Sequence, residues 1–325
     1  MATTSFAPPP VDPDDPLLRA PGLRSALDAL AVELDLGPAV RDQLLAAHVP
    51  LCRAIDRRRR DVGRPLIVGV HGAQGSGKTT FCRFAEVLLH HGFGWTVCGF
   101  SIDDCYLGAE SRRELARTVH PLFATRGVPG THDVGLGTTL IDRLRDADAA
   151  SRIPIPSFDK ARDDRVPSTD WEAFEGTADI VIFEGWCVGI PPQDDNALEA
   201  PLNALEATED PDGTWRRRVN HHLRTDYADW FDRLDLLIML EVPGFEQVRR
   251  WRGLQEEKLA RRHPDAPGLM DAAALDRFLM HYERLTRHAL ATLPAVADVV
   301  CRLDANHRIV RIESRDIGLP TEIDP

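Results

Sequence analysis

The sequence predicts an α/β fold, a doubly wound and mostly parallel sheet with helices on both faces, preceded by an N-terminal helical extension. Continuous apolar runs such as DIVIFEGW from Asp179 are typical of strands buried on both faces of a parallel sheet. These runs alternate with helical patterns, as crossover connections between parallel strands require. A glycine-rich turn follows the first run directly, and such sheets bind ligands outside the carboxyl ends of their strands.

The first 64 residues precede the predicted sheet. Residues 1–20 are Pro-rich and acidic, so we expect them to be disordered. Residues 21–64 are predicted to form the helical extension, because leucines recur at helical spacing in two segments separated by Gly37. Pro50 lies inside the second segment, where a proline favours a kink.

The main domain is predicted over residues 65–325. Its strands are expected at 66–71, 95–101, 179–184, 235–241 and 298–303. Residues 190–215 are acidic and Pro-rich, which indicates an inserted loop or a short helical excursion.

Composition excludes several classes of protein. A net charge of −12 over 325 residues disfavours nucleic acid or an anionic membrane as the main partner. The longest apolar run, from Leu234 to Leu240, contains Asp235 and is far shorter than the roughly 18 residues of a membrane span. The six cysteines lack any C-x-x-C spacing and lie mostly in apolar patterns, so we expect reduced thiols and a cytoplasmic location.

A phosphate-binding loop is the strongest local signal. Residues Gly72 to Thr79 read GAQGSGKT and match the pattern G-x-x-x-x-G-K-[ST], in which backbone N–H groups surround a phosphate. Lys78 is predicted to reach the β- and γ-phosphates, and the Thr79 hydroxyl to bind Mg²⁺. The residues expected to bind the nucleotide are Gly72, Ala73, Gln74, Gly75, Ser76, Gly77, Lys78, Thr79 and Thr80. The sequence therefore predicts binding of a nucleoside triphosphate.

Acidic residues follow two of the predicted strands. Asp103 and Asp104 come directly after the strand at 95–101, which suits them for proton abstraction or metal binding beside the loop. The alternative is that Asp103 and Asp104 only form a turn or cap a helix at the end of the strand. Glu184 ends the strand at 179–184, where it is suited to Mg²⁺ and water or is a solvated strand end.

Two groups of cations accompany them. Arg249, Arg250 and Arg252 open a helical stretch that is either a lid closing over ATP or a solvated helix face. The segment SFDKARDDR from Ser157 is either a site for an anionic acceptor or a charged loop.

Several segments, in order, resemble one family. They are SIDDCYL from Ser101, RGVPGTHD from Arg126, PSFDKARDDR from Pro156, FEGWCVG from Phe183, WRRRVNHHL from Trp215, FEQVRRWRGLQEEKLARR from Phe245 and LDANHRI from Leu303. Together they resemble the glycerate kinase family of the phosphoribulokinase, uridine kinase and pantothenate kinase superfamily. The resemblance implies a fold of the P-loop kinase type, the cofactors ATP and Mg²⁺, and a small-molecule hydroxyl acceptor.

The resemblance also implies roles on the acceptor side. Asp103, in the pattern S-x-D-x-x-Y that ends at Tyr106, is the implied general base. Tyr106, His132 and Asp133 lie where relatives contact the acceptor, and Lys160 and Arg165 are the implied partners of its carboxylate. Cys105 stands where an aromatic residue is common in relatives, which leaves the shape of the acceptor pocket open.

On the nucleotide side, the resemblance implies that Lys78 and Thr79 hold phosphates and Mg²⁺, that Glu184 lies near the metal, and that Arg249 and Arg252 are lid arginines. Asn306 and His307 are placed near the adenine. D-glycerate is the expected acceptor. The alternatives are uridine, pantothenate or a sugar phosphate, or a nucleotide-binding regulator without catalysis. A GTPase is disfavoured because the sequence has no Asn-Lys-x-Asp motif.

Overall fold

A seven-stranded sheet forms the centre of the molecule. The computed structural model describes residues 3–262 and 270–315, so residues 1–2, 263–269 and 316–325 of the predicted regions lie outside the described residues. Across the sheet the order is β1-β11-β10-β9-β2-β8-β3. The strands are β1 (Thr3–Phe6), β2 (Leu66–Gly72), β3 (Val97–Ser101), β8 (Ile180–Gly185), β9 (Leu236–Glu241), β10 (Val299–Leu303) and β11 (Ile309–Arg315).

The five strands predicted from apolar runs are β2, β3, β8, β9 and β10, and neighbours among them pair in parallel. The last two strands on one side of the sheet, β11 and the edge strand β1, are antiparallel to their neighbours. Side chains alternate between the faces: in β8, Ile180 and Ile182 enter one apolar core, whereas Val181 and Phe183 enter the other. The predicted fold class is confirmed.

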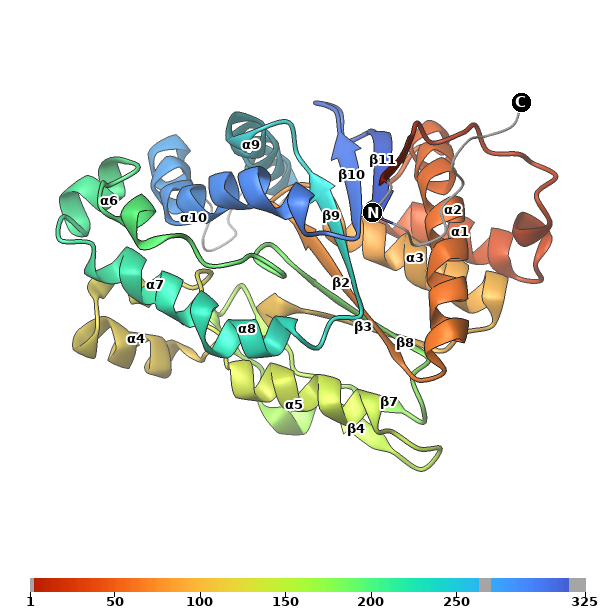
Figure 1. Cartoon of the computed structure of the whole chain (residues 1–325), viewed down its shortest axis with the longest axis horizontal. Helices are drawn as coiled ribbons and strands as arrows, with labels where there is room; N and C mark the ends of the chain where they lie inside the picture. Colours follow the sequence, from red (N-terminus) through yellow and green to blue (C-terminus); the bar gives the residue numbers. More distant parts are fainter. Residues whose placement is uncertain (1–2, 263–269, 316–325) are drawn as a thin grey trace.

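Helices cover both faces of the sheet (Figure 1). On one side lie α1 (Leu23–Glu33), α2 (Pro38–Val62) and α3 (Lys78–Phe93). On the other lie α5 (Val134–Arg145), α7 (Thr214–Arg224), α8 (Asp226–Phe231) and much of α10 (Ala272–Thr292). The remaining helices are α4 (Ala109–Thr118), α6 (Ala204–Glu209) and α9 (Phe245–Arg262). Two small ribbons pair β4 (Arg152–Pro154) with β7 (Ala173–Glu175) and β5 (Phe158–Asp159) with β6 (Asp164–Arg165).

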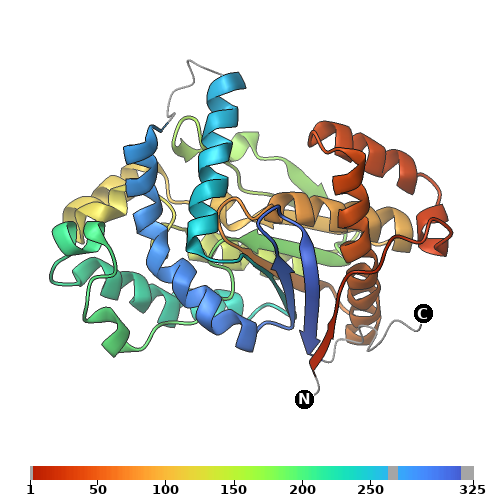
Figure 2. The same cartoon turned by 90° about the horizontal axis from the view of Figure 1, so that it is seen from above.

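The start of the chain differs from the expected disorder. Residues 3–6 form β1, which pairs along β11 at the edge of the sheet (Figure 2). Pro16–Arg19 form a single 3-10 turn whose Leu17 is buried. The acidic composition that indicated disorder includes Asp15, whose carboxylate accepts two hydrogen bonds from Arg53 of α2, at 2.7 and 2.8 Å. Burial of Phe6 and Leu17 supplies the apolar contact that the composition argument overlooked.

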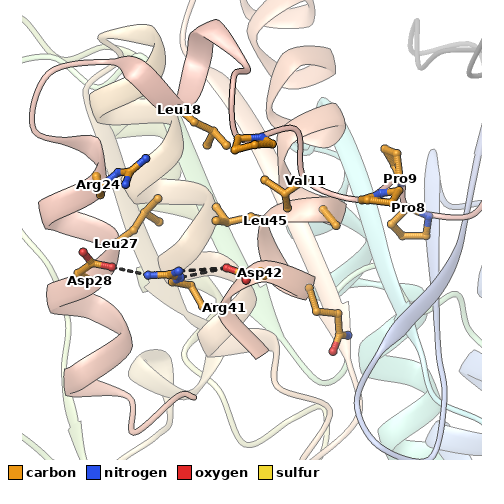
Figure 3. Close-up of a pocket in the computed structure, with 14 residues that line it drawn as sticks. Pro8, Pro9, Val11, Leu18, Arg24, Leu27, Asp28, Arg41, Asp42 and Leu45 are labelled. Atoms are coloured by element: carbon orange, nitrogen blue, oxygen red, sulfur yellow. Dashed lines mark hydrogen bonds and ion pairs between the residues drawn. The ribbon is translucent and has the colours of Figure 1, made fainter. Parts of the chain in front are cut away.

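The N-terminal helical extension encloses a pocket of about 700 Å³ (Figure 3). Residues Pro8 to Pro13 pass over α1 and α2, and Leu27 and Leu45 lie among its apolar lining. Arg41 on α2 donates hydrogen bonds to Asp28 of α1 at 2.5 Å and to its neighbour Asp42 at 3.1 Å. Two helices were predicted here, and the structure has two, with Gly37 capping α2 and Pro50 inside it.

The acidic segment 190–215 contains a 3-10 turn at Asp195–Leu198, helix α6 and the start of α7. Two buried ion pairs hold this segment in place. Arg284 of α10 donates to both carboxylate oxygens of Glu206, at 2.7 and 2.6 Å, and Arg216 pairs with Asp210 at 3.0 Å. Both carboxylates are completely buried, and the Glu206–Arg284 pair joins the excursion to α10, so loss of either partner would leave an uncompensated buried charge.

The six cysteines are buried free thiols. Among the described residues, no helix combines the length and hydrophobicity needed to cross a bilayer.

Candidate active site

The phosphate loop joins β2 to α3. Gly72 is the last residue of β2, and Lys78 is the first of α3. Gly75 and Gly77 have φ angles of 76° and 85°, in the left-handed region that side-chain-bearing residues rarely adopt. A Cβ on Gly72 would lie 2.5 Å from Ser76 Oγ, so this position also requires glycine. The glycine spacing therefore reflects the curvature of the loop.

Several polar atoms of the loop lack partners. Both side-chain polar atoms of Gln74 and the Ser76 hydroxyl are buried and make no hydrogen bond within the described residues. Buried polar atoms are normally paired. A phosphate bound at the N-terminus of α3 would provide acceptors for such donors. The residues present therefore fit a phosphate group.

Glu184 and Thr79 form the predicted metal site. The Thr79 hydroxyl donates to Glu184 Oε1 at 2.9 Å, and Lys78 Nζ lies 4.0 Å from Glu184 Oε2. Glu184 Oε2 is buried and has no hydrogen-bond partner in the described chain. Hydroxyl and carboxylate oxygens suit Mg²⁺, which typically takes only one or two carboxylates and completes its shell with water and phosphate. The pair therefore fits Mg²⁺.

Asp103 lies on the 3-10 turn Ile102–Cys105 that follows β3. Lys160 Nζ donates to its Oδ2 at 2.6 Å. Burial by itself would raise the pKa of Asp103, but the charges of Lys160 and Lys78 outweigh it and hold that pKa below its usual range. Asp103 is therefore an ionised carboxylate facing the loop, the state that a general base requires.

Asp104 has a structural role. Its Oδ2 accepts the Ser101 backbone N–H at 2.9 Å and completes a capping box around the turn. Burial raises the pKa of Asp104 to about 6. The alternative of a helix cap therefore applies to Asp104, whereas Asp103 faces the loop.

The loop and Asp103 border one cavity of about 410 Å³. Of the predicted site residues, it is lined by Gln74, Gly75, Gly77, Lys78, Thr79, Thr80, Asp103, Tyr106, Lys160 and Arg252. The cavity has five further lining residues for which no role was predicted, namely Arg126, Trp186, Gln255, Phe278 and Tyr282. Arg126, Trp186 and Gln255 do fall inside the RGVPGTHD, FEGWCVG and FEQVRRWRGLQEEKLARR segments, so the resemblance could have pointed to them. Phe278 and Tyr282 come from α10, where no motif pointed to the site.

Three residues assigned to acceptor contact do not line this cavity. His132 lies behind Tyr106, with the two rings stacked at 4.5 Å, and burial lowers its pKa to about 3, so it is neutral. Asp133 caps α5 by accepting the Leu136 N–H at 3.0 Å. Arg165 donates to the Tyr106 carbonyl from Nε and Nη2, at 3.2 and 2.9 Å. All three support the wall of the cavity from outside.

The two predicted lid arginines differ. Arg252 lines the cavity and pairs with Glu256 on its own helix, at 2.5 Å. Arg249 is exposed, does not line the cavity, and donates to Asp276 of α10 at 2.7 Å. Only Arg252 therefore faces the loop in this conformation.

The turn between β10 and β11 touches the loop. His307 Nε2 lies 2.8 Å from the Gly75 carbonyl oxygen, and its ring stacks on Trp251 of α9 at 3.9 Å. Asn306 donates its backbone N–H to Asp304 at 2.8 Å. The segment predicted to lie near the adenine thus borders the phosphate loop.

Comparison with known proteins identifies relatives but no matching family model. The chain is 34% identical over 243 residues to a kinase named mug58 of Schizosaccharomyces pombe, a match covering 71% of this chain and 83% of that protein. It is 30% identical over 239 residues to the chloroplastic D-glycerate 3-kinase of Arabidopsis thaliana. That match covers 71% of this chain but only about half, 49%, of the Arabidopsis protein.

A solved structure has the same fold. The D-glycerate 3-kinase of Cryptococcus neoformans superposes with a TM-score of 0.68 at 23% identity, covering 86% of this chain and 100% of that one. The relatives are kinases, and the cavity holds a phosphate loop with a carboxylate beside it. The protein is therefore an ATP-dependent phosphotransferase with an alcohol group as acceptor. The chain belongs to the D-glycerate 3-kinase family.

Proposed function

We propose that this kinase transfers the γ-phosphoryl group of ATP to D-glycerate and forms 3-phosphoglycerate. The observation that carries the proposal is the ionised Asp103 carboxylate, which borders the same cavity as the phosphate loop and pairs with Lys160. The name of the Arabidopsis relative points to the same acceptor. The six buried free thiols support a cytoplasmic location.

Asp103 acts as the general base. Its Oδ oxygen takes the proton of the acceptor hydroxyl, the hydroxyl oxygen attacks the γ-phosphorus, and the bond to the β-phosphate oxygen breaks to release ADP. Lys78 and Arg252 stabilise the charge on the transferred group and on the leaving ADP. Thr79 and Glu184 are the residues that would hold Mg²⁺, which when bound neutralises phosphate charge.

The acceptor side favours a small anion. Lys160 is the proposed partner of the acceptor's carboxylate, since it lines the cavity on the flexible stem of an exposed side chain. Tyr106 forms a wall, and His132, Asp133 and Arg165 hold that wall in place from behind. Arg249 contributes as a lid arginine only when it leaves Asp276.

A panel of acceptors tests the proposal. ADP release is measured with D-glycerate, L-glycerate, uridine, pantothenate and a sugar phosphate, and the phosphorylated position is identified by phosphorus NMR. D-glycerate should give the highest kcat/KM and a 3-phospho product. Equal or faster turnover of uridine or pantothenate would overturn the choice of acceptor while leaving the kinase activity in place.

A further inference from the structure

Arg126 lines the cavity at the phosphate loop, and the proposed mechanism does not use it. It lies just after the 3-10 turn Pro121–Ala124 and lines the cavity together with Lys160 and Asp103. Arg165, the other arginine of this region, does not line it. An arginine facing a cavity with a general base is well suited to bind a planar anion there.

The backbone at Arg126 is held by two aromatic side chains that also line the cavity. The Tyr282 hydroxyl donates to the Arg126 carbonyl oxygen at 2.9 Å, and Trp186 Nε1 donates to the Gly127 carbonyl oxygen at 2.9 Å. The two rings pack edge to face, 4.8 Å apart. Such contacts fix where the Arg126 side chain begins, which is the condition for a precise recognition site.

Gly127 permits this close approach. Its φ angle is 132°, and a Cβ there would fall 2.0 Å from the Tyr282 hydroxyl oxygen. Only glycine allows both the conformation and the contact. The position of Arg126 is therefore built into the fold.

The guanidinium group of Arg126 retains free donors. Within the described residues its hydrogen bond is from Nη1 to Asp163, and its carbon lies 5.5 Å from the centre of the Phe158 ring. Nε and Nη2 have no protein acceptor there. Because a guanidinium can bind a carboxylate with two parallel hydrogen bonds, these donors suit the carboxylate of an acceptor.

In Arg165, the corresponding donors are already hydrogen-bonded within the protein. Its Nε and Nη2 bond the Tyr106 carbonyl oxygen, and Nη2 also lies 3.3 Å from Asp133 Oδ2. Tyr106 directly follows the turn that carries Asp103. Arg165 therefore holds the backbone next to the base and has no donor pair aimed at the cavity.

We propose that Arg126, together with Lys160, binds the carboxylate of a short hydroxy acid, and that Arg165 is a positioning residue for the turn carrying Asp103. Trp186 and Tyr282 position Arg126. This assignment rests on the proposed function only for the nature of the acceptor, a hydroxy acid.

The test separates binding from turnover. Binding of D-glycerate and of its uncharged analogue glyceramide is measured by calorimetry for the wild type, Arg126→Gln, Arg126→Lys and the matched control Arg165→Gln. Arg126→Gln should weaken D-glycerate binding by about 10- to 100-fold, the range for lost hydrogen bonds to a charged group. It should bind glyceramide and ATP as the wild type does, and Arg126→Lys should recover part of the loss.

Arg165→Gln should behave differently. It should keep the preference for glycerate over glyceramide, lower kcat, and shift the acidic limb of the pH–rate profile, because the Asp103 turn is less well held. Melting temperatures check that each variant folds, and Arg126→Lys carries the test if Arg126→Gln does not fold.

The assignment is overturned if Arg126→Gln keeps the wild-type preference for glycerate, if Arg165→Gln abolishes that preference, or if the wild type binds no D-glycerate. Failure of the proposed function alone looks different. There the wild type binds D-glycerate through Arg126 but does not phosphorylate it, and the binding assignment stands.

Discussion

The molecule has two hollows of contrasting character, the pocket of the N-terminal extension and the cavity at the phosphate loop. The first is the larger, about 700 Å³ against about 410 Å³. In it, Arg41 is already shared between Asp28 and Asp42 (Figure 3). None of its fourteen lining residues, all within the described chain, has a buried side-chain polar atom without a partner.

The phosphate-loop cavity is the opposite. Gln74 lines it with both side-chain polar atoms unpaired, and the unpaired atoms of Ser76 and Glu184 belong to the adjoining loop and metal site. Unpaired buried polar atoms are costly, and a phosphate or Mg²⁺ bound here would supply the partners that these atoms lack. Between these two hollows, the unpaired polar atoms, and not the volume, mark the one that fits a ligand.

The largest expected effect separates the two hollows directly. Asp103→Asn removes the proposed base and should lower kcat roughly 100- to 10,000-fold, the usual contribution of general-base catalysis, with ATP still bound. The matched control is Asp42→Asn in the N-terminal pocket, which should leave kcat unchanged. Steady-state kinetics and ATP calorimetry measure both. Full turnover by Asp103→Asn would refute the assignment of the base.

A second change tests the metal side. Glu184→Gln removes the charge facing Lys78 and weakens the acceptor of the Thr79 hydroxyl, so the Mg²⁺ concentration that supports ATP binding should rise by about 10- to 100-fold. Calorimetric titration of ATP at several Mg²⁺ concentrations measures it. Glu33→Gln, which breaks an exposed pair with Arg83, serves as the control and should change nothing. An unaltered Mg²⁺ requirement in Glu184→Gln would argue against the metal site.

A third change concerns the pH dependence. The lowered pKa of Asp103 means that its ionised form, and with it turnover, is lost only as the pH falls through that low value. Lys160→Met removes the main opposing charge and leaves burial, so the pKa rises and turnover is lost at a higher pH. The profile of kcat against pH measures the shift. Arg162→Met, on the same ribbon, is the control, and an acidic limb that stays in place in Lys160→Met would contradict the ion pair.

The smallest effect belongs to the N-terminal pocket. Arg41→Ala breaks two ion pairs whose carboxylates are more than half exposed, so the free energy of unfolding should fall by about 0.5–1 kcal/mol. Turnover should not change. Denaturant unfolding and steady-state kinetics measure these quantities. A loss of turnover in this variant would connect the pocket to catalysis and erase the contrast between the hollows.

Parts of the fold were predictable because their causes are local. The runs that became β2, β8 and β9 are apolar along their length, and Gly75 and Gly77 adopt the positive φ angles that the loop motif implies. The antiparallel strands β1 and β11 were not predicted. Thr3–Phe6 becomes a strand only by pairing with residues 312–315, and composition carries no information on that partner.

The sequence by itself determined the phosphate loop, the acids at two strand ends and the kinase family, since each depends on residues adjacent in the chain. Tertiary structure decided which groups meet. It brought Lys160 onto Asp103 across 57 residues, placed Arg126 in the cavity and left Arg165 outside it. Those contacts depend on the order of the strands and the packing of the ribbons between them, which local patterns do not encode.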